Sequence, residues 1–530
     1  MKKFLRNLFS GYILVLVILV LEGAILFFAQ FGIDILIKQI LNNVKDISNL
    51  QILIRAVIAL SYAVFKVAAF IIEILIFLKI VNKAENPEFK IPWIVGLFIL
   101  PLFSSIVYLI FGIHRFSKQD RQVMDLSKEA YKKYAKISEE MKVDLGHSAG
   151  TFNYLNNVTS LGAHKNNKVT YFGEGADFFN DVIDKLKQAK EFIFIEFFII
   201  SDGKYWSEIK QILIDKAKQG VEVKLIYDDM GSSGSISSKT PKELGKYGIQ
   251  CYKFHPFKPI LSGIYNNRDH RKIVVIDHDY GYTGGINLAD EYGNLIERFG
   301  YWKDSMIRIE GSAIENLITI FLQNFDFAQG KVSDFEKYLS YEYPTFENQS
   351  YVMPFGDGPG NVDNALIGEQ TYINIINYAK TEVYITTPYL VPTYGLIDAL
   401  RNAALRGVKV HLIVPGIPDK KLVYKMAESN FAYLLAAGVN IYRYTPGFNH
   451  QKSIIADGRL AMVGTINFDF RSLVHHYECG AVIYKDDSLK EILSDHQQMV
   501  KDSTPVPKDY KQTGFYKRLC AVIKIISALL

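Results

Sequence analysis

A duplicated motif limits what this chain can fold into more than any other feature of its sequence. The pattern H-x-K-x(4)-D-x(6)-G-x(2)-N occurs first at His270, Lys272, Asp277, Gly284 and Asn287. It occurs again, with identical spacing, at His450, Lys452, Asp457, Gly464 and Asn467. Five fixed residue types in two copies exclude coincidence. Repetition over this length predicts two homologous domains rather than a solenoid, whose repeats are roughly 20 to 50 residues long.

The segments around the motif repeat as well. AKEFIFIEFF, from Ala189, matches AKTEVYITTPYL, from Ala379, and AKQGVEVKLIYD, from Ala217, matches ALRGVKVHLIVP, from Ala404. In each copy a helical pattern is followed by a β-rich run, a second helix and a second β-rich run. Such alternation predicts an α/β fold with a parallel or mixed sheet covered on both faces. We expect two α/β/α sandwich domains, a first copy at residues 166–345 and a second copy at 346–510, in a pseudo-twofold arrangement.

The first 112 residues are strongly apolar, which predicts a transmembrane helical region of two or three helices. Residues 11–31 carry one charge, Glu22, and residues 91–111 carry none, although they include Pro101. About 20 apolar residues are enough for a helix to cross a bilayer, and proline kinks are tolerated there. Residues 52–81 are apolar but contain four charged residues, so a third span and a helix lying in the membrane interface both stay open.

Basic residues near these segments indicate how they are oriented. The last apolar run is followed by a group of basic residues: His114, Arg115, Lys118 and Arg121. By the positive-inside rule they place the C-terminal bulk of the chain on the cytoplasmic side. We therefore expect a multi-pass protein of the cell membrane with cytoplasmic catalytic domains. The three cysteines form neither a disulfide framework nor a metal-binding spacing.

Two further segments flank the expected domains. Residues 113–165 are charged and then polar, which predicts a linker with one or two exposed helices. Residues 511–530 interleave apolar residues with Lys517, Arg518 and Lys524, as in a basic amphipathic helix on a membrane, and a terminal helix packed on its own domain stays the alternative. The net charge of +5 is too small to indicate nucleic-acid binding, whereas a modest positive balance suits an anionic lipid surface.

The motif residues are suited to binding and transferring a phosphodiester. His and Lys, two apart on a predicted strand, project from the same face, so each copy supplies one imidazole and one cation. The groups that would hold the phosphate oxygens are Lys272, Lys452, Asn287 and Asn467. One histidine would then attack phosphorus, forming a phosphohistidine, while the other protonates the leaving alkoxide. This scheme requires neither a metal nor another cofactor.

A nucleophile and a general acid require one neutral and one protonated histidine. Neighbouring carboxylates can orient each ring and stabilise its imidazolium. Asp304 and Glu478 follow the two motifs at similar places, each just before alternating apolar residues typical of a strand. We expect them to orient the histidines, with surface or ion-paired positions as the alternative. Asp277 and Asp457 lie seven residues beyond the histidines, where pleat alternation turns a strand residue away from them, which favours a structural role.

These residues resemble the phospholipase D superfamily, and within it the chain looks most like a bacterial cardiolipin synthase over residues 170 to 510. The more specific matches are GGINLADEY, YWKDSMIRIEG, FGDGPGNVD, TTPYLVP and GTINFDFRS. Two features depart from the family pattern. Gly285 and Thr465 stand where the superfamily often has serine, and the first apolar region is longer than the usual two-span anchor.

The resemblance implies that each copy has the phospholipase D-like fold and that both H-x-K-x(4)-D motifs, Asp277 and Asp457 included, are catalytic. It makes His270 the nucleophile and His450 the acid/base, a choice that the residues alone leave open. The implied reaction transfers a phosphatidyl group from one phosphatidylglycerol to another, giving cardiolipin and glycerol. The expected partners are phosphatidylglycerol and an anionic membrane, without nucleic acid, and the oligomeric state stays open.

Other functions use the same motifs. A membrane-bound phospholipase D would hydrolyse its lipid, and a related phosphatidyltransferase would use another alcohol such as serine or ethanolamine. A membrane-tethered nuclease is disfavoured, because the chain has no dense basic stripe with stacking aromatic residues. A scaffold without activity is hard to reconcile with two intact motifs.

Overall fold

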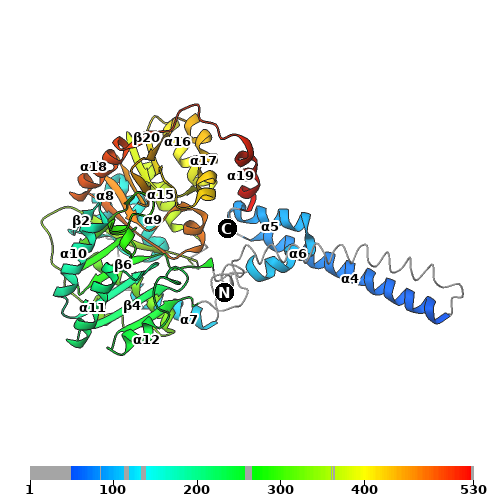
Figure 1. Cartoon of the computed structure of the whole chain (residues 1–530), viewed down its shortest axis with the longest axis horizontal. Coiled ribbons are helices and arrows are strands. Elements are labelled where there is room, and N and C mark those ends of the chain that lie inside the picture. The colour runs from blue at the N-terminus through cyan, green and yellow to red at the C-terminus, as the bar shows by residue number, and fades with distance from the viewer. Residues whose placement is uncertain are drawn as a thin grey trace. The chain divides into compact units, whose positions relative to one another are not determined.

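The computed structural model describes residues 49–83, 85–112, 118–132, 139–256, 266–359, 361 and 365–526. They fall into two compact units, which divide between His114 and Arg115. Figure 1 shows the elements of both units, each of which is described by itself below.

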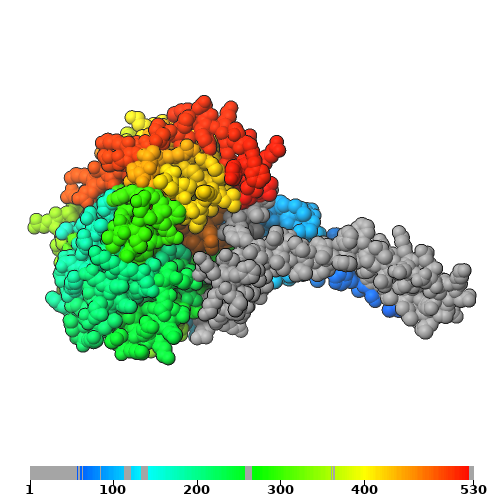
Figure 2. Space-filling view, in the orientation of Figure 1, coloured from blue at the N-terminus to red at the C-terminus, as the bar shows by residue number. Residues whose placement is uncertain are grey.

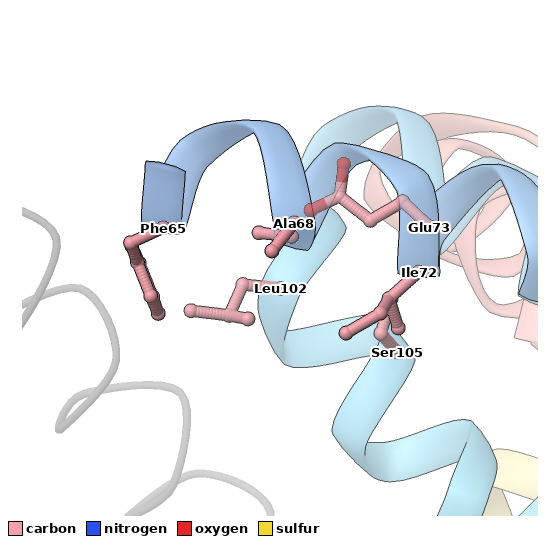
Figure 3. A pocket seen from close by; sticks show the side chains of 7 residues that line it. Phe65, Ala68, Ile72, Glu73, Leu102 and Ser105 are labelled. Atoms are coloured by element: carbon pink, nitrogen blue, oxygen red, sulfur yellow. The ribbon is translucent and has the colours of Figure 1, made fainter. Parts of the chain in front are cut away.

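The first unit is helical. Its elements are α4 (Asn49–Asn82), α5 (Pro87–Ile99), α6 (Pro101–Val107) and a π-helical turn, η2 (Tyr108–Gly112). The side chain of Asn86 caps α5 by accepting a hydrogen bond from the backbone N–H of Glu88 at 3.0 Å. A hollow of about 170 Å³ lies between α4 and α6 (Figure 3), lined by Phe65, Ala68, Ala69, Ile72, Glu73, Leu102 and Ser105.

The expectation of one kinked helix over residues 91–111 is wrong. The chain leaves the helical conformation at Leu100, whose φ and ψ are −136° and 74°, because the ring of Pro101 disfavours a helical residue before it. Among the described residues no helix is both long and apolar enough to cross a membrane. The span expected at residues 11–31 lies outside the described residues, and residues 52–81 fall within α4.

The first copy of the repeat is built on a seven-stranded mixed sheet in the second unit. In order across the sheet, the strands are β2 (Lys168–Phe172), β9 (Met306–Glu310), β7 (Tyr280–Gly284), β6 (Lys272–Ile276), β3 (Phe192–Phe197), β4 (Glu222–Asp228) and β5 (Gln250–Phe254). Strands β3, β4 and β5 are parallel, whereas β6 and β7 run antiparallel to their neighbours. The motif strand β6 is buried throughout and is apolar after Lys272, as expected for a strand covered on both faces.

The second copy repeats this order within a nine-stranded sheet. Its strands, in order, are β1 (His164–Lys165), β10 (Tyr351–Asp357), β19 (Glu478–Tyr484), β17 (Leu460–Gly464), β16 (Ser453–Ala456), β11 (Glu382–Thr386), β13 (Lys409–Pro415), β14 (Asn440–Tyr444) and β20 (Ser503–Pro505). Strands β11, β13 and β14 are again parallel, and the motif strand β16 lies antiparallel beside β11. The predicted α/β fold with two homologous domains and mixed sheets is therefore confirmed.

Helices cover both sheets. The larger ones are α10 (Gly175–Gln188), α11 (Lys204–Lys218), α13 (Ile314–Gln329), α15 (Ile367–Tyr378), α16 (Tyr394–Leu405), α17 (Lys421–Ala436) and α18 (Ser488–Lys501). One buried core packs α10 and α11 on the first sheet. A second core is continuous from the first sheet through α13 to the second sheet. The two copies, cyan to green and yellow to red in Figure 2, therefore share one interior.

Residues 113–165 differ from the expected exposed linker. They contain α7 (Lys118–Lys132), α8 (Glu139–Leu145) and α9 (Ala149–Thr159), and β1 pairs with β10. Leu145, Phe152 and Leu155 are fully buried in the shared core. The expectation failed because the few apolar residues of this polar segment fall on one face, Phe152 and Leu155 being one turn apart.

The C-terminal helix α19 (Gly514–Ile526) has one face packed and one face open. Cys520 is fully buried, and the amine of Lys524 donates to Asn430 of α17 at 2.6 Å. Phe515 and Val522 are 72% and 63% exposed. These contacts correspond to the alternative of a terminal helix packed on its own domain, with an apolar and basic face left free.

Candidate active site

Each motif histidine is held at its backbone by the other copy. His270 lies just before β6, and its N–H donates to the carbonyl of Tyr477 at 2.9 Å. His450 lies just before β16, and its N–H donates to the carbonyl of Lys303 at 2.7 Å. The second contact continues a parallel pairing of β8 (Tyr301–Lys303) with β15 (Gly447–Asn449). The two motifs therefore meet at the contact between the copies.

The side chains of the two histidines pair with carboxylates across the same contact. His270 Nδ1 lies 2.9 Å from a carboxylate oxygen of Glu478, which belongs to the second copy. His450 Nδ1 lies 2.6 Å from a carboxylate oxygen of Asp304, which belongs to the first. Both carboxylates are at most 1% exposed. The sequence predicted that these residues lie together, and the structure adds that the pairs are crossed between copies.

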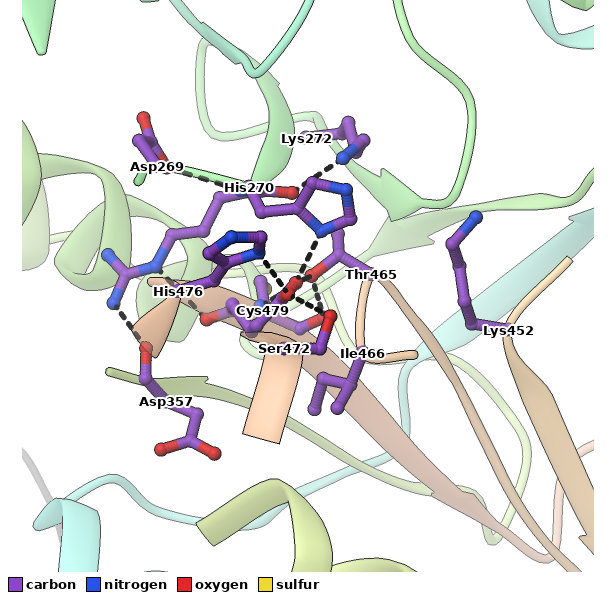
Figure 4. Close-up of polar contacts among 12 residues, drawn as sticks. Asp269, His270, Lys272, Asp357, Lys452, Thr465, Ile466, Ser472, His476 and Cys479 are labelled. Atoms are coloured by element: carbon purple, nitrogen blue, oxygen red, sulfur yellow. Dashed lines mark hydrogen bonds and ion pairs between the residues drawn. The ribbon is translucent and has the colours of Figure 1, made fainter. Parts of the chain in front are cut away.

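The two carboxylates are positioned differently by their surroundings. Glu478 accepts a hydrogen bond from Ser472 Oγ at 2.6 Å and another from the hydroxyl of Thr465. With His270, these donors converge on the Glu478 carboxylate, and Figure 4 labels all three residues. Asp304 accepts from the N–H of Ser305 at 2.8 Å and lies against Gly285, where an added Cβ would come within 2.0 Å of its Oδ1. The two positions where the superfamily often has serine therefore differ in what they do: Thr465 donates to Glu478, whereas Gly285 leaves room for Asp304.

The centre carries buried positive charge. Lys272 and Lys452 are both 0% exposed, and burial lowers the pKa of Lys272 to about 7 and that of Lys452 to about 8. Burial, and then the charges of the two lysines, hold the pKa values of His270 and His450 well below the ordinary range. Burial also raises the pKa of Asp304 to about 6. Each of these pKa shifts favours the neutral form of its group. A bound anion would raise the pKa values of the lysines and histidines and so favour their charged forms.

The two motif asparagines are not equivalent. Asn287 accepts from the N–H of Ile199 at 3.0 Å and donates to the hydroxyl of Tyr292 at 2.6 Å. Asn467 is 4% exposed, and its Oδ1 is buried without a hydrogen-bond partner in the described part of the chain. A buried polar atom without a partner is costly. The free Oδ1 of Asn467 suits a ligand hydroxyl, whereas a phosphate oxygen would need the Nδ2 donor of the same amide.

The motif aspartates lie at the far end of the motif strands. The carboxylate of Asp277 accepts from the N–H groups of residues 190–192 at 2.7 to 2.8 Å. That of Asp457 accepts from the N–H groups of residues 380–382 at 2.8 to 3.0 Å. Both residues have positive φ angles, 49° and 52°, which aspartate tolerates better than most residues. These contacts fix the turn before β3 or β11 and do not reach a histidine, which favours the structural interpretation of both aspartates.

A third histidine at this centre was missed by sequence reasoning. The ring of His476 lies 5.3 Å from that of His270, and its Nδ1 lies 3.6 Å from the carboxylate of Glu478. Burial lowers the pKa of His476 to about 3. His270, His476 and Glu478 each offer a ligand atom within 4.8 Å of the others, the only such metal-sized group among the described residues. The adjacent histidines of HHYE were the available signal.

Comparison with known proteins agrees with this geometry. A family model described as "Cardiolipin synthase, PLD-like domain" matches residues 182–298 and 372–500. Cardiolipin synthase 2 of Bacillus anthracis is 33% identical over 88% of this chain and 91% of its own length. Cardiolipin synthase 2 of Bacillus cereus is 34% identical, over 86% of this chain and 87% of its own.

A solved structure shares the fold. Phosphatidylserine synthase of Haemophilus influenzae is 15% identical, with a TM-score of 0.53 over 72% of this chain and 98% of its own. At that identity the likeness concerns the fold alone. The level and extent of identity to the Bacillus proteins, together with the paired motifs, show that this chain belongs to the cardiolipin synthase family of the phospholipase D superfamily and is a phosphatidyltransferase.

Proposed function

We propose that the protein transfers a phosphatidyl group from one phosphatidylglycerol to another, releasing glycerol and forming cardiolipin. The observation that carries this proposal is the pair of crossed imidazole–carboxylate contacts, His270 with Glu478 and His450 with Asp304, beside two buried lysines. The Bacillus relatives support the choice of lipid, because they are cardiolipin synthases and the match covers 91% and 87% of their length.

In the first step His270 acts as the nucleophile. Its Nδ1–H donates to Glu478, which leaves the lone pair of Nε2 for attack on phosphorus. A P–N bond forms as the bond from phosphorus to the glycerol oxygen breaks, and His450 donates its Nε2 proton to that oxygen. Lys272, Lys452 and Asn467 would bind the non-bridging oxygens and offset the charge of the transition state.

In the second step the same groups work in reverse. His450 removes the proton from a hydroxyl of a second phosphatidylglycerol, and the resulting oxygen attacks phosphorus. The new P–O bond gives cardiolipin, the P–N bond breaks, and His270 returns to its starting state. Asp304 stabilises the imidazolium of His450 that forms in this step. The choice of His270 rather than His450 as nucleophile follows the family resemblance.

We also propose that the enzyme works at the cell membrane, with its catalytic copies on the cytoplasmic side. Its lipid substrates are in the bilayer, and the basic residues after residue 112 are those expected on the cytoplasmic side. The free face of α19, with exposed Phe515 and Val522 beside Lys517 and Arg518, suits an anionic lipid surface.

A product assay tests the proposed function. Purified full-length protein in detergent micelles containing only phosphatidylglycerol should produce cardiolipin and glycerol in equal amounts. His270→Gln should lower this rate by at least about a thousandfold, whereas His147→Gln, at an exposed position outside the site, should leave it unchanged. Phosphatidic acid as the main product would indicate a hydrolase instead, and a preference for added serine or ethanolamine would indicate another transferase.

A further inference from the structure

One loop of the second copy lies beside the catalytic centre without belonging to either motif. It runs from Gly416 to Lys420, between β13 and α17. The N–H groups of Gly416 and Ile417 both donate to the carbonyl of Gly447 at 3.2 Å. Gly447 begins β15, the strand that leads into His450. The loop is thereby held against the segment that delivers the proposed acid/base.

Tyr389 connects this loop to the other side of the site. It precedes β12 (Leu390–Val391), which pairs with β18 (Phe468–Asp469), the strand that directly follows Asn467. The hydroxyl of Tyr389 donates to a carboxylate oxygen of Asp419 at 2.6 Å, and the amine of Lys420 lies 4.7 Å from the centroid of the Tyr389 ring. One aromatic side chain thus positions both a carboxylate and a cation.

Asp419 and Lys420 have unused binding capacity. The second carboxylate oxygen of Asp419 is buried and has no hydrogen-bond partner within the described ranges. A buried oxygen of this kind is stabilised when a ligand hydroxyl donates to it. Lys420 is exposed, and it forms no ion pair with a carboxylate of the described residues. The charge of Lys420 contributes to the lowered pKa values of both His270 and His450, and the loop that carries it is held against the segment leading to His450.

The proposed reaction needs such groups. Both lipids are anions, and the two buried lysines serve the phosphate that is transferred. The acceptor brings a second phosphate, separated from its attacking hydroxyl by only the three carbons of glycerol. This phosphate must lie near the first and therefore needs a cation of its own. The middle hydroxyl of the same glycerol needs an acceptor.

We propose that Tyr389, Asp419 and Lys420 form the subsite for the headgroup of the acceptor lipid. Lys420 binds the phosphate of the second phosphatidylglycerol, and Asp419 accepts a hydrogen bond from the middle hydroxyl of its glycerol. Tyr389 is a positioning residue for both. The subsite selects an anionic lipid alcohol over water and over neutral alcohols. This inference rests on the proposed function.

A competition between two acceptors tests the subsite. Full-length protein in micelles of phosphatidylglycerol with added 1-propanol forms cardiolipin and phosphatidylpropanol from one common covalent intermediate. Their ratio therefore reports the acceptor step and cancels any effect on the first step. Lys420→Met should lower the ratio of cardiolipin to phosphatidylpropanol about tenfold, and Lys420→Arg should restore most of it. Lys421→Met, the same change at the adjacent exposed lysine, should leave the ratio unchanged.

A second ratio tests Asp419 separately. The measured quantity is the amount of labelled glycerol exchanged into phosphatidylglycerol, relative to phosphatidylpropanol. This ratio should fall about tenfold in Asp419→Ala, which removes the acceptor oxygens. It should stay unchanged in Lys420→Met, because glycerol has no phosphate. Lys420→Gln replaces Lys420→Met if the latter does not fold. Equal ratios in wild type and both Lys420 and Asp419 variants would overturn the subsite. If wild-type protein forms no cardiolipin at all, the proposed function fails instead.

Discussion

At the scale of single residues, burial shifts the pKa values of the charged groups at the site. Lys272 and Lys452 are lysines in a position that water does not reach, so their protonation is set by the site itself. The crossed carboxylates are equally enclosed, and each is adjusted by one neighbour, Thr465 for Glu478 and Gly285 for Asp304. Gly285 and the two buried lysines give direct tests.

Gly285 is expected to tolerate no side chain. In Gly285→Ala the new Cβ would lie within 2.0 Å of Asp304 Oδ1, so the carboxylate must move away from His450. We expect cardiolipin formation to fall by about a hundredfold, with the protein still folded. Thermal unfolding and the lipid assay, run on the same preparations, check this. Gly245→Ala, at a glycine with open space around it, is the control, and full activity of Gly285→Ala would contradict the role of Asp304.

The buried lysines predict how activity depends on pH. Both pKa values are lowered, to about 7 for Lys272 and about 8 for Lys452, so the free enzyme loses positive charge as the pH rises through that range. A bound phosphate stabilises the charged form and raises both pKa values. We therefore expect kcat/KM to fall above about pH 8 while kcat falls less. A kcat/KM that rises steadily to pH 10 in micelles of fixed composition would contradict charged lysines as the phosphate ligands.

At the scale of elements, each motif strand has two ends with different tasks. The N-terminal end presents histidine and lysine, and the C-terminal end, at Asp277 or Asp457, fastens the turn before the neighbouring strand through backbone N–H groups. In the proposed function, one strand therefore carries the catalytic histidine and lysine at one end and a structural aspartate at the other. A motif aspartate can therefore be required for folding without contacting a lipid.

Substitution of Asp277 separates those two functions. Asp277→Ala removes three hydrogen bonds to buried or half-buried N–H groups and places alanine at a positive φ. We expect a loss of about 2 to 4 kcal/mol in the free energy of unfolding, measured by urea denaturation. Asp277→Asn keeps an acceptor oxygen and tolerates the φ angle, so its loss should be smaller. Per folded molecule, the rate of cardiolipin formation should stay near that of wild type, and a rate as low as that of His270→Gln would show a catalytic aspartate.

At the scale of the whole molecule, the site lies where the two copies of the repeat meet within one chain. Both histidines, both lysines and both carboxylates come from one polypeptide, and the core that joins the two sheets is continuous. Neither copy has a complete centre, because each carboxylate serves the histidine of the other. One chain should therefore form a complete catalytic centre without a second chain.

A mixing experiment tests this. Equal amounts of His270→Gln and His450→Gln protein should remain inactive together, because each chain lacks one of its own two histidines. The turnover of wild-type protein per chain should also be independent of protein concentration at a fixed ratio of lipid to detergent. Restored activity in the mixture, checked after refolding the two variants together and apart, would mean that copies are exchanged between chains.

Much of this molecule could be predicted from the order of its residues. The repeat indicated two homologous α/β domains, since similar segments fold alike, and the spacing of His and Lys placed both on one face of a strand because strand geometry is local. Pleat alternation likewise turned Asp277 and Asp457 away from the histidines. Each of these inferences depends on geometry within a few residues.

Only the tertiary structure decided which groups meet. Glu478 faces His270, Asp304 faces His450 and one face of α9 is buried because two sheets dock around a shared core. Contacts of this kind join residues far apart in the chain, such as Asp304 and His450, and their free energy depends on the packing of both copies at once. Local sequence patterns carry no record of that packing, so the residues of the site were predictable whereas their pairing was not.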